Sequence, residues 1–275
     1  MKIKLITLIL ALSCLLCACV GGGETVNNEE NAKKLNTAIE STNGESRVAG
    51  EYMLEVTFGE GTTLYYAMGD VSWDSKSLLA YAEFDQTYLA VSSRVKNYFA
   101  NGKMISVDGG ETIESKREST ELFSKFPYAN IAPYGKSCGD IKVGSNSVGT
   151  TYTFTVTNAK SLSNTIIGED IYTIAKVLKK PQPEKTQYGD IKCVFTVKDE
   201  KIVSCRYEYS LKLFDTPPYV PGYSVPESEY TLDVKIVAKI TYNSFGDGVE
   251  INEYSGESVE ESTDNTSENS EELSE

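Results

Sequence analysis

The amino-acid sequence predicts an α+β protein built on an antiparallel sheet. One segment with a helical spacing of apolar residues, Asn27–Thr42, precedes a run of segments in which apolar and polar residues alternate. A second helical segment, Ser163–Pro181, separates this run from further alternating segments. Because helices and strands are grouped along the chain, parallel β-α-β units are not expected.

The first helix and the first strand follow from their periodicity. Within Asn27–Thr42 the apolar positions 32, 35, 38 and 39 share one face, and Asn28 is placed to cap the N-terminus. The segment Glu51–Phe58 alternates strictly, which predicts a strand with one buried face. Further strands are expected over Thr63–Asp74, Ser77–Asp85, Thr150–Thr157 and Tyr230–Asn243.

A tight hairpin is predicted between Arg94 and Val107. The dipeptide Asn101-Gly102 lies between two alternating runs, and a two-residue type I′ turn requires positive φ at both of its positions. This register sets Phe99 opposite Met104 and Tyr98 opposite Ile105.

A second hairpin is predicted over Asp190–Leu213, with odd-numbered apolar residues on one face of both strands. A three-residue loop at 198–200 would set Cys193 directly opposite Cys205, whereas a loop at 199–201 would offset them by two. The two cysteines are therefore either a cross-strand disulfide or two buried thiols. Cys138 is expected to stay unpaired.

Two further segments are candidates for contact with a ligand. The helix within Ser163–Pro181 carries Ile171, Ile174 and Leu178 on one face, and we expect it to act as a movable lid over the sheet. The segment Phe214–Tyr230 is rich in proline and tyrosine, including Tyr219 and Tyr223, and is either a ligand-contacting rim or a packed crossover.

The N-terminus resembles a bacterial lipoprotein signal. Two lysines precede the apolar run Leu5–Leu16, which at about 1.5 Å per residue is too short to span a membrane. Leu16-Cys17-Ala18-Cys19 matches the lipobox, so residues 1–18 are expected to be removed and Cys19 to carry the lipid. Residues 19–27 would then form a flexible tether with three glycines. The protein is expected to be anchored by lipid to the outside of a cell membrane.

Composition argues against several classes of function. The chain contains no histidine, so histidine-based triads and most catalytic zinc sites are excluded or made improbable. The net charge of −14 includes eight acidic residues within 255–275, which are expected to form a disordered tail. No basic stripe indicates nucleic acid. Ser93–Lys96 fits the S-x-x-K pattern of penicillin-interacting enzymes, but it lies on a predicted strand and lacks their companion motifs. From composition and motifs together we expect no enzymatic activity, no metal and no cofactor.

The order of elements resembles the lipoprotein-carrier (Lol-type) and mycobacterial glycolipid-carrier superfamily, in particular its Gram-positive members. The resemblance is carried by AKKLNTAIES followed by GEYMLEVTF, by VKNYFANGKMISVDGG, by CVFTVKDEKIVSCRYEY and by KITYNSFGDGVEI. It implies one domain over residues 28–254, folded as a strongly curved antiparallel half-barrel whose concave apolar face is covered by helices. Some relatives hold a lipid there, and the family brings no catalytic residue.

Two functions follow as hypotheses. The first is a non-enzymatic membrane-anchored lipoprotein that binds a lipid or another amphipathic ligand between sheet and helices. The alternative is an interaction or sensory ectodomain that has a filled core and contacts another envelope protein.

Overall fold

The computed structural model describes residues 28–58, 61–88, 91–116, 131–157, 185–214 and 231–255, with positions 221, 224 and 226. Within these residues one helix and twelve strands are formed. They are α2 (Asn28–Asn43), β1 (Arg47–Phe58), β2 (Thr62–Asp74), β3 (Leu79–Tyr88), β4 (Val91–Ala100), β5 (Lys103–Asp108), β6 (Glu111–Lys116), β7 (Lys142–Ser145), β8 (Thr150–Val156), β9 (Lys185–Tyr188), β10 (Ile191–Lys198), β11 (Lys201–Phe214) and β12 (Thr231–Phe245). In this part of the chain no helix is both long enough and apolar enough to cross a membrane.

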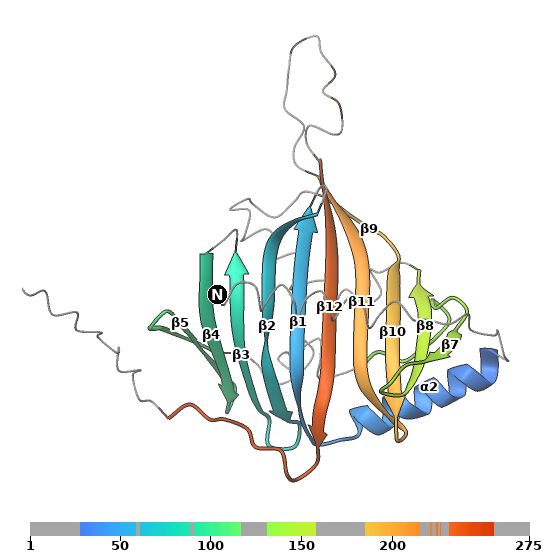
Figure 1. The fold of residues 1–275 in the computed structure, drawn as a ribbon. Coiled ribbons are helices and arrows are strands. Elements are labelled where there is room, and N and C mark those ends of the chain that lie inside the picture. Colours follow the sequence, from blue (N-terminus) through green and yellow to red (C-terminus); the bar gives the residue numbers. More distant parts are fainter. Residues whose placement is uncertain are drawn as a thin grey trace, which may run out of the picture.

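All twelve strands belong to one antiparallel sheet. Its order is β6-β5-β4-β3-β2-β1-β12-β11-β10-β8-β7, and β9 pairs with β11 outside this path. Figure 1 shows the strands side by side, with α2 next to the β10, β8 and β7 side of the sheet. Because β6 and β7 do not pair with each other, the sheet stays open, and the α+β half-barrel expected from the sequence is confirmed.

The hairpin between β4 and β5 forms as predicted. Asn101 and Gly102 have φ angles of 53° and 73°, the left-handed conformation that the two central positions of a type I′ turn require. Phe99 pairs with Met104 and Tyr98 with Ile105. Local turn chemistry therefore sets the register of this hairpin.

The hairpin between β10 and β11 differs from both predicted loops. Its turn has two residues, Asp199 and Glu200, with φ angles of 51° and 60°. A register shift follows, because Val197 pairs with Ile202 and Thr196 pairs with Ser204, which leaves Val203 as an extra residue. This bulge restores the odd-numbered inward face that a two-residue turn alone would have reversed.

The same bulge decides the positions of the two cysteines. Cys193 pairs with Tyr207 and Cys205 with Phe195, so the cysteines are offset by two, and both thiols are free. Diagonal neighbours of this kind lie farther apart than the Cβ atoms of a disulfide. The structure therefore does not place Cys193 and Cys205 for the cross-strand bridge considered above.

Helix α2 packs on the sheet through the apolar face that its periodicity predicts. Leu35, Ala38 and Ile39 are buried in the core. Near its end the Thr42 hydroxyl donates to the Ala38 carbonyl (2.8 Å) and accepts from the Ile202 N–H (2.8 Å). Because this bond joins α2 to the start of β11, it fixes where the helix lies over the sheet.

Asparagine side chains of α2 hold the segment between residues 131 and 141. Asn36 donates to the Tyr134 carbonyl (3.0 Å) and accepts from the Tyr134 N–H (2.8 Å). Asn43 forms the same pair of bonds with the backbone of Ile131, at 2.9 and 3.0 Å. Each carboxamide thus pairs with a backbone that has no strand partner there, as buried peptide groups require.

Candidate functional site

The candidate site is the face of the sheet against which α2 packs, which we call the inner face. The paired positions that define it are Val48, Tyr52, Leu54 and Val56 in β1, Tyr65, Ala67, Val71 and Trp73 in β2, Ala80, Ala82 and Phe84 in β3, Phe195 and Cys193 in β10, Cys205, Tyr207, Tyr209 and Leu211 in β11, and Val234, Ile236, Ala238 and Ile240 in β12. Nearly all of these side chains belong to one apolar cluster. The inner face is therefore a continuous apolar surface across the middle strands of the sheet.

Charged side chains are separated from this surface by strand alternation. In β1 to β4, β8 and β10 to β12, every Asp, Glu, Lys and Arg occupies a position that faces outward in the strand register. On the outer face some of them form ion pairs, such as Glu83 with Arg94 (2.9 Å) and Glu208 with Lys235 (2.7 Å). The inner face of these strands is uncharged.

The half of the inner face between β8 and β12 is filled. The rings of Phe154 and Phe195 meet edge-on with their centroids 5.3 Å apart, and the rings of Phe195 and Tyr207 meet in the same way with their centroids 5.5 Å apart. Burial raises the pKa of the Cys193 and Cys205 thiols, so these cysteines are protonated, and we expect them to behave as small apolar residues. This half forms the packed core.

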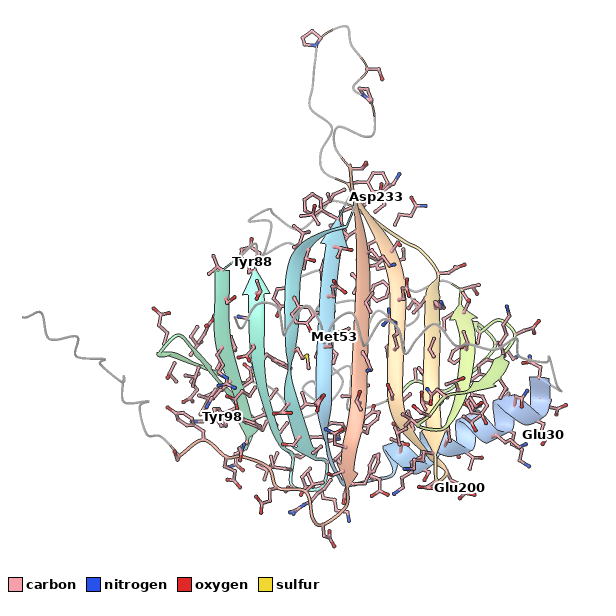
Figure 2. The ribbon with its side chains drawn as sticks, viewed as in Figure 1. Glu30, Met53, Tyr88, Tyr98, Glu200 and Asp233 are labelled. Carbon is pink, nitrogen blue, oxygen red and sulfur yellow. The ribbon has the colours of Figure 1, made fainter. Side chains whose placement is uncertain are left out.

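The other half, between β2 and β6, is only partly covered. Phe84, Tyr88 and Val95 are partly buried on the inner face of β3 and β4. Tyr88 lies at the upper end of β3 in Figure 2. At the margin Val91 and Ile113 are 69% and 63% exposed. We call this area the open half, because its apolar side chains retain contact with solvent.

Gly69 lets β3 come very close to β2 on the inner face. A Cβ at this position would lie 1.8 Å from the backbone oxygen of Glu83 in β3, so only glycine fits here. Across it, the rings of Tyr52 and Phe84 meet with their centroids 6.0 Å apart. The apolar surface of the core thereby continues into the open half.

Polar side chains on the open half are hydrogen-bonded to one another. The Tyr65 hydroxyl donates to the Gln86 carbonyl oxygen (3.0 Å), and the Gln86 amide donates to the Ser93 hydroxyl (2.9 Å). The Ser106 hydroxyl donates to the Asn97 carbonyl oxygen (2.7 Å). These groups suit an uncharged ligand that has its own hydrogen-bonding atoms, whereas the described residues hold no cluster of three side chains suited to a metal ion.

The residues predicted from the sequence have different outcomes. Cys193 and Cys205 lie in the filled half of the inner face. The other predicted residues, namely Cys19, Ile171, Ile174, Leu178, Tyr219 and Tyr223, lie outside the described residues, as does the tail beyond residue 255. The inward polar residues of β2 to β5 were not predicted. Their sequence signal is a polar residue at a position that strand alternation directs inward.

No protein-family model and no curated protein matches this chain. The solved structures that are similar in fold include three crystal structures. Lipoprotein LppX from Mycobacterium tuberculosis is 9% identical, with 82% of this chain and 100% of that chain covered and a TM-score of 0.44. LprF from Mycobacterium bovis is 11% identical, with 84% and 98% covered and a TM-score of 0.39. A LolA superfamily protein from Nitrosomonas europaea is 5% identical, with 83% and 96% covered and a TM-score of 0.27.

These similar structures include a mycobacterial lipoprotein and a LolA superfamily protein, the two groups that the order of elements resembles. With identities of at most 11% and TM-scores below 0.5, these similarities identify neither a ligand nor a site in this chain.

Proposed function

We propose that this protein is a non-enzymatic, lipid-anchored lipoprotein of the cell envelope that binds a lipid or another amphipathic molecule on the open half of its inner face. The observation that carries the proposal is the inner face of β2 to β4, which is apolar, bears no charged side chain and stays partly exposed. Burial of apolar surface yields roughly 25 cal/mol per Å², so an acyl chain laid along Phe84 and Val95 would gain from leaving water.

The anchor in this proposal rests on the sequence. The lipobox Leu16–Cys19 and the three glycines after it would place the folded domain outside the cytoplasm, held to the membrane at Cys19. A protein held there is close to the lipids of the membrane surface. Anchoring and ligand binding are thus compatible parts of one function.

Native mass spectrometry of residues 20–275, which include every residue the structure describes, tests ligand binding. After incubation with phospholipid and glycerolipid vesicles, we expect a population of the protein with one bound lipid. The variant Val95→Glu, which puts a charge on the inner face, should lose that population. Met68→Glu is the matched control, because Met68 is exposed on the outer face of β2.

Absence of bound lipid from the wild-type domain would contradict ligand binding. If the folded wild-type domain carries no lipid after incubation with any vesicle, the binding proposal is wrong. The interaction or sensory ectodomain, with a face that docks another envelope protein, would then be the better hypothesis.

A further inference from the structure

The open half of the inner face offers hydrogen-bond donors that its internal bonds do not use. Gln86 has two amide hydrogens, and the bond to Ser93 uses one of them. Ser93 accepts that bond, which leaves its own O–H available to donate. The Asn97 carbonyl accepts from Ser106, a bond that uses neither of the two amide hydrogens of Asn97.

These donors lie among apolar side chains on neighbouring strands. Gln86 pairs with Ser93 across β3 and β4, and Asn97 lies four residues farther along β4, about 13 Å away at 3.3 Å per residue. Between these positions Phe84 pairs with Val95 on the same face. An apolar patch is therefore flanked by two polar groups, an arrangement that matches a molecule with both kinds of surface.

The charge distribution selects among amphipathic ligands. On β3 and β4 the charged side chains Glu83, Asp85 and Arg94 face outward and pair with one another. The nearest charge at an inward register position is the carboxylate of Asp108 in β5, which pairs with Val95. An ionised carboxylate or phosphate on the inner face of β2 to β4 would therefore meet no cation there, and burying an unpaired charge is strongly unfavourable. Ester and hydroxyl oxygens accept hydrogen bonds without this penalty.

We propose that Gln86 and Ser93 form a subsite for the uncharged, oxygen-bearing head group of a neutral lipid, such as a glycerol ester. This inference rests on the proposed function and specifies its ligand class. The head group accepts hydrogen bonds from the Gln86 amide and the Ser93 hydroxyl, and the acyl chain lies on Phe84 and Val95 in the direction of Asn97. Fatty acids and anionic phospholipids bind less well.

The test compares three lipids that share one oleoyl chain. Residues 20–275 are incubated at pH 8 with equal concentrations of monoolein, oleate and oleoyl lysophosphatidylglycerol, and bound lipids are counted by native mass spectrometry. Monoolein should exceed each anionic lipid by about tenfold, the ratio that corresponds to roughly 1.4 kcal/mol.

Two variants and one control assign that preference to the subsite. Gln86→Leu and Ser93→Ala should each reduce monoolein binding by about twofold to tenfold, the range for one neutral hydrogen bond. Thr87→Val is the control, because Thr87 is hydrogen-bonded to Ser92 (3.0 Å) between the same two strands on the outer face. Its lipid binding should not change. If Gln86→Leu does not fold, Ser93→Ala alone decides the outcome.

The outcomes separate the two proposals. Equal binding of the three lipids, a preference for oleate, or unchanged monoolein binding in both variants would overturn the neutral-lipid subsite and leave lipid binding in place. Absence of all three lipids from the wild-type protein would overturn lipid binding itself, and the subsite with it.

Discussion

Asp74, at the end of β2, is only 3% exposed and nevertheless favours its charged form. Burial alone would raise the pKa of this carboxyl group, but hydrogen bonds from the side chain and backbone of Ser77, from Arg47 and from the Lys76 N–H outweigh it. The pKa falls to about 2 from an ordinary value of 3.8. The bonds from Arg47 and Lys76 measure 2.8 and 2.9 Å.

This pKa predicts how the stability of the protein depends on pH. Because the carboxyl binds its proton less readily in the folded state, its contribution is complete above about pH 4 and is lost as the pH falls toward 2. It amounts to at most about 2 kcal/mol. Urea unfolding of Asp74→Asn should show a correspondingly smaller loss of stability between pH 5 and 2 than the wild type. Equal losses in both proteins would refute the assignment, and Asp70→Asn, an exposed neighbour in the same strand, is the control.

Several contacts of single side chains could not be predicted from the sequence. Asn28 was predicted as a helix cap, yet its side-chain oxygen accepts from the Ile141 N–H, which lies 113 positions away. Gln86 and Ser93 are polar residues at inward positions, but the sequence does not show that they bond to each other. Such contacts depend on which segments the fold brings together, and no local pattern encodes them.

Among the elements, α2 depends on its polar face as much as on its apolar one. Its apolar periodicity predicts the burial of Leu35 and Ile39, which the structure confirms. No local pattern assigns a contact to Asn36 or Asn43. In the structure Asn36 and Asn43 pair with the backbone of the segment 131–141, which packs Ile131 and Ile141 into the core.

Replacing Asn36 tests this connection between elements. Asn36→Ala removes both bonds to the Tyr134 backbone, and we expect a loss of about 1–3 kcal/mol in the free energy of unfolding. Hydrogen exchange at the Tyr134 amide should accelerate more than exchange in β12. Lys33→Ala, on the exposed side of the same helix, should change neither quantity. Unchanged exchange at Tyr134 in Asn36→Ala would contradict the role assigned to this side chain.

The two hairpins show why some registers are predictable and others are not. In the β4–β5 hairpin Asn101-Gly102 specifies the turn, and the pairing follows from local sterics alone. In the β10–β11 hairpin the turn Asp199-Glu200 by itself gives the wrong face, and a bulge at Val203 corrects it. The correction is favoured because it keeps the odd-numbered side chains in the core, which is a property of the whole sheet.

For the whole molecule, the anchor is the part of the proposed function that can be tested in cells. Cys19→Ala should move the protein from the membrane fraction to the soluble extracytoplasmic fraction, because no residue remains to carry the lipid. Cys17→Ala is the matched control, since the lipobox tolerates a small residue at that position and lipidation should continue. Immunoblots of both fractions give the answer. Membrane retention of Cys19→Ala equal to that of the wild type would refute the anchor.

The features that depend on neighbouring residues follow from the sequence alone. Strand alternation separated charged from apolar residues, the Asn101-Gly102 turn set one register, and the α+β class followed from the order of the elements. These features are local because dihedral preferences and side-chain alternation act over a few residues.

The tertiary structure sets which residues meet on the inner face, and no local pattern does so. It showed that one half is filled by aromatic side chains and that the other half presents Gln86, Ser93 and Asn97 beside partly exposed apolar residues. It also decided between the two registers left open for Cys193 and Cys205, which are offset by two. The physical reason is that these arrangements arise from strand pairing and packing across the whole sheet, where the burial of apolar surface selects among registers that are locally equivalent.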